Sequence, residues 1–238
     1  MTETLRAKFT AQGWLRGVSR AVPITLGYIP IGFAYGVLAQ KAGLSAFNTL
    51  AMSIFVYAGS SQLIAVGLFA AGVEPLSIIL TTFVVNLRHM LMASALAPYL
   101  SRWRKLKLAA FAYEITDESF ALHSVEFLKG PPDAAESLAL NMTAQVSWVL
   151  GSWLGLVAGE LITDVKLFAL DYALPAMFIA LLLMQIKDKV QVIVTVSTGV
   201  IAVALLLAGL DQWYVIVATL MGATLGVVLE QWIKQPSS

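Results

Sequence analysis

The sequence predicts an all-α polytopic integral membrane protein with about seven transmembrane segments, some of them broken or re-entrant. Hydrophobic residues make up 59% of the 238 residues and charged residues only 12%, whereas soluble domains carry about 25% charged residues. Long runs without a charge recur along the chain, and most approach the roughly 20 residues with which a helix crosses a bilayer. Such a chain cannot cover a soluble surface, so we expect it to lie in the lipid bilayer.

The same composition excludes several classes of protein. The net charge of +1 provides no field that attracts nucleic acid. Cysteine is absent, which excludes disulfides and thiolate metal sites, and His89 and His123 are too few for an obvious metal cluster. The sequence contains no nucleophile elbow, phosphate loop or paired metal-ligand motif. We therefore expect neither enzymatic activity nor a cofactor.

Seven apolar segments account for the predicted spans. Five contain no charged residue, and they cover 21–40, 44–73, 137–159, 190–210 and 212–229. A sixth, 75–100, qualifies if its polar cluster at 86–89 is tolerated, and a seventh, 167–186, qualifies if Asp171 is tolerated. The stretch 108–122 is too short and too acidic for an ordinary span, so we expect a re-entrant or interfacial helix there.

The basic residues give conflicting signals about the early topology. Four of them precede position 21 and four more lie between 102 and 107, and each group predicts a cytoplasmic location. Three full crossings between the two groups cannot satisfy both. Either one early segment is re-entrant, or the N-terminus lies outside. Polar or proline-containing interruptions at Pro23, Pro30, 59–62 and 86–89 favour broken helices, although Pro and Gly are also simply common in membrane helices.

A faint internal repeat is also present. The pattern Gly32-x-x-x-Gly36-x-x-Ala39 resembles Gly151-x-x-x-Gly155-x-x-Ala158, about half the chain away. It suggests a single transporter domain over 1–238 with repeat halves at 14–122 and 134–234. The alternative is that both patterns, like Gly222-x-x-x-Gly226, are general close-packing signatures of membrane helices.

The cluster Asn86-Leu87-Arg88-His89 is the first candidate site. A charge at the centre of a membrane segment costs roughly 3 kcal/mol on insertion scales, so its presence indicates a function. The forked donors of Arg88 match a substrate carboxylate, Asn86 offers both a donor and an acceptor, and His89 is a candidate for proton coupling. The alternative for Arg88 is pairing with an internal acid.

Two further polar clusters interrupt or flank the apolar runs. In Gly59-Ser60-Ser61-Gln62, a helix that restarts at Ser60 or Ser61 would offer free N–H groups to a carboxylate. Interhelical hydrogen bonding by the same side chains is the alternative. Glu114, Asp117 and Glu118 are spaced to share one helical face. One of them, with Asp117 and Glu118 preferred, would carry a proton or meet a substrate ammonium, unless all three are simply solvated at the interface.

Read in order, these motifs resemble the AzlC family of branched-chain amino-acid exporters. The residues that carry the resemblance are Pro23-x6-Pro30-x-Gly32-Phe33-x2-Gly36, Ser53-x4-Tyr57-Ala58-Gly59-Ser60-Ser61-Gln62, Asn86-Leu87-Arg88-His89, Thr116-Asp117-Glu118-x-Phe120-Ala121 and Pro175-Ala176-Met177-Phe178. The resemblance covers nearly the whole chain and is specific only as an ordered combination.

The resemblance implies the large subunit of a multi-pass exporter in the bacterial inner membrane. Such a subunit works with a small hydrophobic AzlD-like membrane subunit and draws energy from an ion gradient, expected to be a proton gradient. The substrate would be a zwitterionic amino acid with an apolar side chain. Two other functions stay open, which are a non-transporting membrane scaffold subunit and a small-solute or ion channel.

Overall fold

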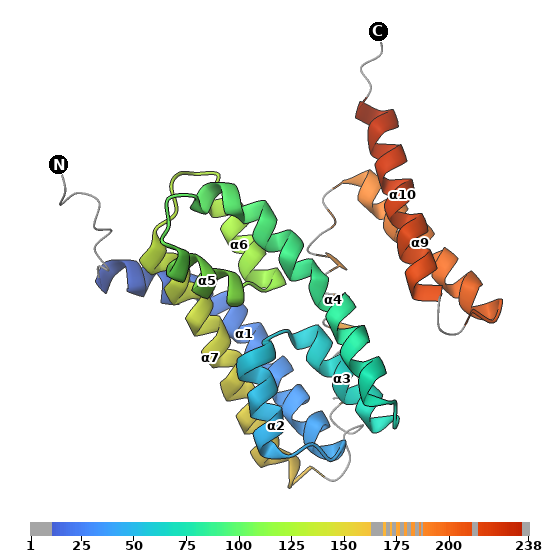
Figure 1. The fold of residues 1–238 in the computed structure, drawn as a ribbon, viewed down its shortest axis with the longest axis horizontal. Helices are drawn as coiled ribbons and strands as arrows, with labels where there is room; N and C mark the ends of the chain where they lie inside the picture. Colours follow the sequence, from blue (N-terminus) through green and yellow to red (C-terminus); the bar gives the residue numbers. More distant parts are fainter. Residues whose placement is uncertain are drawn as a thin grey trace. The chain divides into compact units, whose positions relative to one another are not determined.

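The computed structural model of the chain describes residues 11–162, 188–210 and 214–234, together with 169, 172, 175–176, 179, 182–183 and 186. The chain divides into two compact units, 1–178 and 179–238. Every regular element among the described residues is a helix, which confirms the predicted all-α class (Figure 1). The predicted segment 167–186, with Asp171, lies largely outside the described residues. The prediction of one transporter domain with halves at 14–122 and 134–234 therefore stays a prediction.

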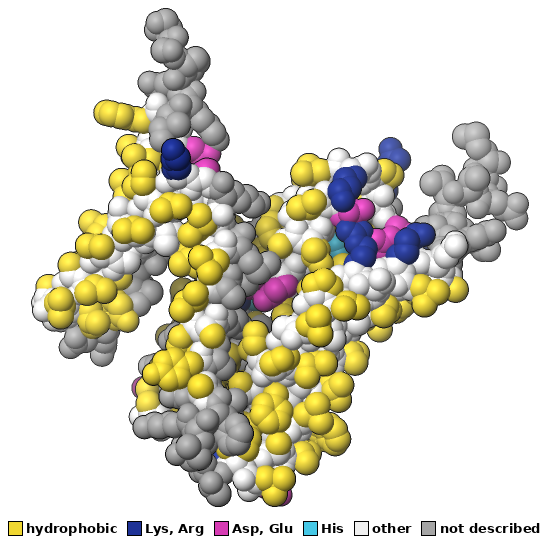
Figure 2. Space-filling view, turned by 180° about the vertical axis from the view of Figure 1, so that it is seen from behind, with side chains coloured by type: hydrophobic (Ala, Val, Ile, Leu, Met, Phe, Trp, Pro, Cys, Tyr) yellow, Lys and Arg dark blue, Asp and Glu magenta, His cyan; other side chains and the backbone are white. Residues whose placement is uncertain are grey.

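Three helices of the described part are long and apolar enough to cross a membrane, and they cover Ala11–Lys41, Pro75–Leu100 and Lys189–Leu207. Large hydrophobic side chains remain exposed over these helices, with Leu26, Phe83 and Val200 each more than half exposed. Figure 2 shows this hydrophobic surface and the charged side chains gathered at one end of the first unit. A lipid-facing exterior explains both observations, because no water is present there to solvate charges.

Helices α1 (Ala11–Lys41) and α7 (Ala134–Gly159) lie side by side and parallel along their whole length. A Cβ atom at Gly36 would lie 2.2 Å from the Ser152 carbonyl oxygen, and one at Gly155 would collide with the Phe33 carbonyl. The two small-residue motifs therefore form one backbone-to-backbone interface, as membrane helices commonly do. α1 continues through Pro23 and Pro30, so the predicted breaks there are wrong.

The second apolar segment forms a hairpin, which we call the first hairpin (46–70). It consists of α2 (Ala46–Ala51), the π-helical turn η1 (Met52–Val56) and α3 (Gly59–Ala70). The backbone breaks at Tyr57, whose φ of 43° is left-handed, and at Ala58. The predicted break is confirmed, and it lies just before Gly59. α3 begins halfway along α7, where a Cβ at Gly59 would meet Trp148.

α4 (Pro75–Leu96), extended by the 3₁₀ turn η2 (Ala97–Leu100), runs antiparallel to α3. It is unbroken at 86–89, so the predicted interruption there is wrong. The cluster contains no helix breaker, and arginine is a good helix former. Arg88 reaches Ser60 of α3 and Asp117 of α6, and the α4 backbone stays helical.

A second hairpin (105–126) contains α5 (Lys105–Tyr113) and α6 (Asp117–Glu126). Its tip lies beside the middle of α1, because Thr116 contacts Tyr28, whereas Glu126 reaches Arg20 near the start of α1. The stretch 108–122 is therefore not a continuous span but part of a helical hairpin, and its re-entrant or interfacial location stays a prediction. The prediction that Glu114, Asp117 and Glu118 share one helical face is wrong, because Glu114 ends α5 and the other two begin α6.

The two hairpins enter the first unit from opposite ends. One end, which we call the basic end, carries Arg16, Arg20, Lys129 and the loop before α5. The second hairpin starts and finishes at the basic end, and the first hairpin starts and finishes at the other. Arg16 and Arg20 of the first basic group thus lie at the same end as the second basic group, as residues of cytoplasmic loops should. The topological conflict in the sequence is resolved by the re-entrant first hairpin.

The order of hairpin and long helix occurs twice, in opposite directions. α3 and α6 begin 58 residues apart, at Gly59 and Asp117, and α4 and α7 begin 59 residues apart, at Pro75 and Ala134. α4 runs toward the basic end and α7 runs away from it (Figure 1). The segments 46–100 and 105–159 therefore have matching elements in inverted topology, an arrangement found in many secondary transporters.

The second unit contains α9 (Lys189–Leu207) and α10 (Tyr214–Lys234), which pack against each other. A Cβ atom at Gly222 would lie 2.1 Å from Thr198 Oγ1, and one at Gly226 would touch Val194. The third small-residue pattern predicted from the sequence is therefore a close helix contact as well.

Candidate functional site

Arg88 of α4 joins the tips of the two hairpins. Its Nη2 donates to Ser60 Oγ at 2.5 Å and lies 3.0 Å from Asp117 Oδ2. Ser60 stands in the first turn of α3 and Asp117 in the first turn of α6. The side chains of Arg88 and Asp117 are 28% and 20% exposed. A single guanidinium thus connects two helix N-termini that approach it from opposite ends of the unit.

The N-terminus of a helix favours an anion, because its first N–H groups lack intrahelical acceptors and carry the positive end of the dipole. The N-terminus of α6 is capped from within, since Thr116 Oγ1 accepts from the Ser119 N–H and Ser119 Oγ accepts from the Thr116 N–H. Ala58, which precedes α3, supplies no side-chain cap. The N-terminus of α3 beside Arg88 is therefore the better place for a ligand carboxylate.

Three polar atoms of α4 and of the tip of the second hairpin are buried without a hydrogen-bond partner in the part of the chain that the structure describes. They are Asn86 Oδ1, Arg88 Nε and Glu114 Oε2. Buried polar groups of native proteins are almost always hydrogen-bonded, so each exception requires an explanation. A polar ligand that binds between the hairpin tips would supply the missing donors and acceptors.

Other predicted site residues have partners within the protein. Gln62 is fully buried, and its Oε1 accepts from the Ala58 N–H at 3.2 Å and from Trp148 Nε1 at 3.1 Å. Ser61 Oγ donates to the Ala58 carbonyl. Gly59 packs against the Trp148 ring, with no room for a side chain. These three residues hold the break in shape, whereas Ser60 contacts Arg88.

The residues predicted to couple transport to protons also have partners within the protein. The Tyr28 hydroxyl donates to Glu118 Oε2 at 2.5 Å and lies 2.7 Å from Thr116 Oγ1. Asp117 pairs with Arg88, and His89 Nδ1 lies 3.1 Å from the Asn86 carbonyl oxygen on its own helix. Sequence reasoning missed Tyr28 and Trp148, although both are polar-tipped aromatics inside apolar runs, which is the available signal.

A model of the family described as AzlC protein matches residues 23–162 of the chain. The chain belongs to the AzlC family. An uncharacterized membrane protein of Archaeoglobus fulgidus is 33% identical over 215 residues, which cover 88% of this chain and 92% of that protein. The resemblance predicted from the motifs is therefore confirmed, and the matched range contains both hairpins, Arg88 and the α1–α7 interface from residue 23 onward.

Named relatives agree with a membrane location. The inner membrane protein YgaZ of Escherichia coli is 29% identical over 90% of this chain and 87% of its own length. The branched-chain amino acid transport protein AzlC of Bacillus subtilis is 27% identical over 87% of this chain and 80% of its own length. These AzlC relatives confirm the predicted multi-pass inner-membrane location. No solved structure matches the chain.

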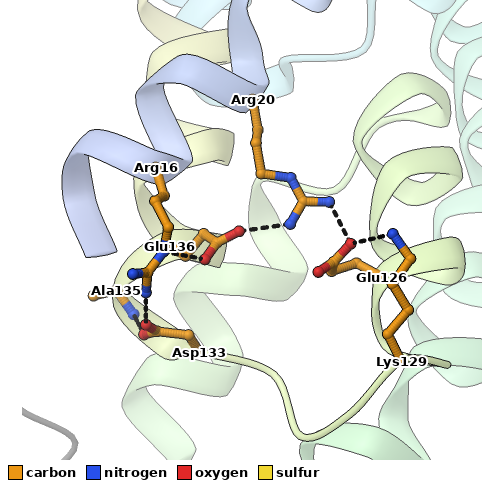
Figure 3. Close-up of polar contacts among 7 residues, drawn as sticks. All are labelled: Arg16, Arg20, Glu126, Lys129, Asp133, Ala135 and Glu136. Atoms are coloured by element: carbon orange, nitrogen blue, oxygen red, sulfur yellow. Dashed lines mark hydrogen bonds and ion pairs between the residues drawn. The ribbon is translucent and has the colours of Figure 1, made fainter. Parts of the chain in front are cut away.

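A second polar cluster of this AzlC protein lies at the basic end and consists entirely of ion pairs. Arg16 contacts Asp133 and Glu136, and Arg20 contacts Glu136 and Glu126 at 2.5 Å and 2.6 Å (Figure 3). The cluster borders a hollow of about 170 Å³ next to His123. It links α1 and the start of α7 to the end of the second hairpin.

Proposed function

We propose that this protein is a secondary transporter that exports branched-chain amino acids across the bacterial inner membrane. The proposal extends to this chain the transport named for its Bacillus subtilis relative. It includes a proton gradient as the energy source and a small hydrophobic AzlD-like subunit as the partner. The observation that carries it is Arg88, which contacts Ser60 and Asp117 at two opposed hairpin tips and whose Nε has no hydrogen-bond partner among the described residues.

The carboxylate of the amino acid binds Arg88 and the N-terminus of α3. Guanidinium and carboxylate form charge-assisted hydrogen bonds, which are about twice as strong as neutral ones. Ser60 Oγ and the backbone N–H groups of the first α3 turn add further donors. Asn86 Oδ1, which lacks a partner in the described residues, accepts a hydrogen bond from the ammonium group. A zwitterion therefore satisfies both kinds of unpaired atom.

Asp117 competes with the substrate for Arg88. In the empty site its carboxylate lies 3.0 Å from the guanidinium, and an incoming carboxylate takes that place. Because Arg88 holds both hairpins, exchanging its partner releases the tip of the second hairpin. That release is a means of alternating access from the two ends. His89, Asp117 and Glu118 remain candidates for proton coupling in this mechanism.

Transport of labelled valine into inverted membrane vesicles tests the proposal. We expect uptake that requires an imposed proton gradient and the small subunit, and we expect Arg88→Ala to abolish it at normal expression. Arg102→Ala, which changes an exposed arginine of the loop before α5, is the matched control. Undiminished uptake by Arg88→Ala would contradict the assigned site.

Counterflow separates a carrier from the alternatives. Vesicles preloaded with unlabelled valine accumulate labelled valine transiently if the protein is a carrier, because the two molecules exchange through one site. A channel dissipates the gradient without such accumulation, and a scaffold subunit shows no flux of its own. Either result would overturn the proposed function.

A further inference from the structure

The acidic residues at the tip of the second hairpin are not equivalent. Asp117 is paired with Arg88 at 3.0 Å, and Glu118 accepts a hydrogen bond from Tyr28. Glu114 is 9% exposed, and its Oε2 has no hydrogen-bond partner among the described residues. The two acids favoured by the sequence as proton carriers are therefore occupied, and the third is free.

Glu114 occupies the backbone break between α5 and α6. It is the C-cap residue of α5, and α6 begins three residues later at Asp117. On the opposite tip, Tyr57 interacts electrostatically with both Glu114 and Glu118. The two hairpin tips and the helices packed against them contain seven further charged or titratable groups. They are Tyr28 of α1, Tyr57 before α3, Arg88 and His89 of α4, Tyr113 of α5, and Asp117 and Glu118 of α6.

A buried carboxylate without a partner is costly, because it has lost its water and gained no compensating bond. Arg88 is the cation paired with the tip acids in the described residues, and it is already shared by Asp117 and Ser60. The free-energy cost of burying the Glu114 carboxylate is removed when a cation binds to it. A proton and the ammonium group of an amino acid are the two cations that the proposed function brings to this place.

We propose that Glu114 is the carboxyl that exchanges a proton for substrate, an inference that rests on the proposed transport of amino acids. In the empty site the carboxyl is protonated. When an amino acid enters from the cytoplasm, the O–H bond of Glu114 breaks, the proton passes to cytoplasmic water, and the substrate ammonium neutralises the carboxylate. On the outer side a proton from the medium reforms the O–H bond as the amino acid leaves.

This exchange explains coupling by a simple competition. One carboxylate cannot be neutralised by a proton and an ammonium at the same time, so each leaves as the other arrives. The result is an antiport, in which a proton moves inward for each amino acid that moves outward. Glu114 binds the exchanging groups, whereas Asp117 and Glu118 position Arg88 and the hairpin tip.

Proton release on substrate binding tests the inference with the protein purified together with its small subunit in weakly buffered detergent solution. Valine binding is measured by tryptophan fluorescence and released protons by a pH-indicator dye. We expect the wild type to release a proton for each valine bound, and Glu114→Gln to bind valine without release. In vesicles Glu114→Gln should retain valine counterflow and lose uptake driven by the proton gradient.

The matched control is Glu160→Gln, which changes an exposed acid after α7. It should release protons as the wild type does. If Glu114→Gln fails to fold, the infrared band of a protonated carboxyl in the wild type serves instead, and it should disappear when valine is added. An unchanged band would overturn the inference.

The outcomes separate this inference from the proposed function. A wild type that binds no valine contradicts the proposed transport activity. A wild type that binds valine without releasing a proton contradicts only the role of Glu114. Equal proton release by the wild type and Glu114→Gln contradicts that role as well.

Discussion

The two hairpins share a shape but are held by different forces. The first hairpin is fixed by neutral, buried hydrogen bonds, such as Ser53 Oγ to Ser152 Oγ at 2.8 Å and Trp148 Nε1 to Gln62 Oε1 at 3.1 Å. The second is fixed largely by charged side chains, with Arg20 against Glu126 and Arg88 against Asp117. Salt and pH should therefore act on the second hairpin and leave the first unchanged.

The difference follows from where the contacts lie. Neutral polar groups can be buried in a membrane protein if each is hydrogen-bonded. Charged groups require a partner and usually some water, and the ion pairs of the second hairpin are partly exposed. The second hairpin also starts and finishes at the basic end. The contacts there are the ones that water and ions can weaken.

The first large effect concerns the interface that supports both hairpins. Gly36→Ala places a Cβ atom 2.2 Å from the Ser152 carbonyl oxygen, so α1 and α7 must separate. Overpacking of this kind costs about 1–3 kcal/mol. Gly27→Ala is the control on the same helix, because a Cβ there meets nothing within 4 Å. Reversible unfolding in mixed detergent should show a lower free energy of unfolding for Gly36→Ala and an unchanged one for Gly27→Ala.

Gln62→Leu tests the first hairpin. The change removes the acceptor of the Trp148 Nε1–H and of the Ala58 N–H and leaves both buried donors unsatisfied. We expect a destabilisation of about 1–3 kcal/mol for each unsatisfied group, with no dependence on salt concentration. Gln145→Leu loses one bond to the Ile54 carbonyl at a half-buried position and should cost less. A strong salt effect on Gln62→Leu would contradict the comparison.

Arg20→Gln tests the second hairpin at the basic end. It removes ion pairs with Glu126 and Glu136, and partly exposed pairs contribute about 0.2–1 kcal/mol each. The difference in stability between Arg20→Gln and the wild type should become smaller in high salt, because exposed charges are screened. Proteolysis of the loop at 130–132, measured at low and high salt, reports the effect. Arg102→Gln in the exposed loop before α5 is the control and should leave proteolysis unchanged.

The smallest expected effect is a dependence on acid pH. The hydrogen bond from Arg20, aided by Lys129, holds the pKa of Glu126 below its ordinary value of 4.5. The carboxylate therefore contributes stability above that ordinary value, and the contribution is lost as the pH falls through the lowered pKa. Unfolding measured from neutral to acid pH should show a smaller acid-induced loss for Glu126→Gln than for the wild type. Equal losses would refute the contribution of this pair.

The sequence located the polar clusters but not their arrangement. The cost of Arg88 in an apolar run predicted a functional role for it, and the small polar run after Ala58 located the broken helix. The clusters at 59–62, 86–89 and 114–118 were all found. The sequence did not predict that Arg88 contacts Ser60 and Asp117. Contacts between helices depend on tertiary packing, which local sequence patterns do not encode.

The errors have a common cause. Pro23, Pro30 and the cluster 86–89 looked like interruptions, yet α1 and α4 are continuous there. Tertiary contacts decide such cases, since a proline kink or a buried charge is tolerated when neighbouring helices satisfy the freed polar groups. The prediction that Glu114, Asp117 and Glu118 share one helical face was wrong for the opposite reason, because the backbone turns at Glu114.

By itself the sequence determined the membrane class, the positions of the apolar segments and the polar clusters, because hydrophobic burial and the cost of charges in lipid are local properties of a segment. Only the tertiary structure decided that two hairpins enter from opposite ends, that their tips meet at Arg88, and that Glu114 alone of the three tip acids lacks a partner among the described residues. These features depend on which distant groups are brought within hydrogen-bond distance, and that is set by the close α1–α7 interface and the fold around it.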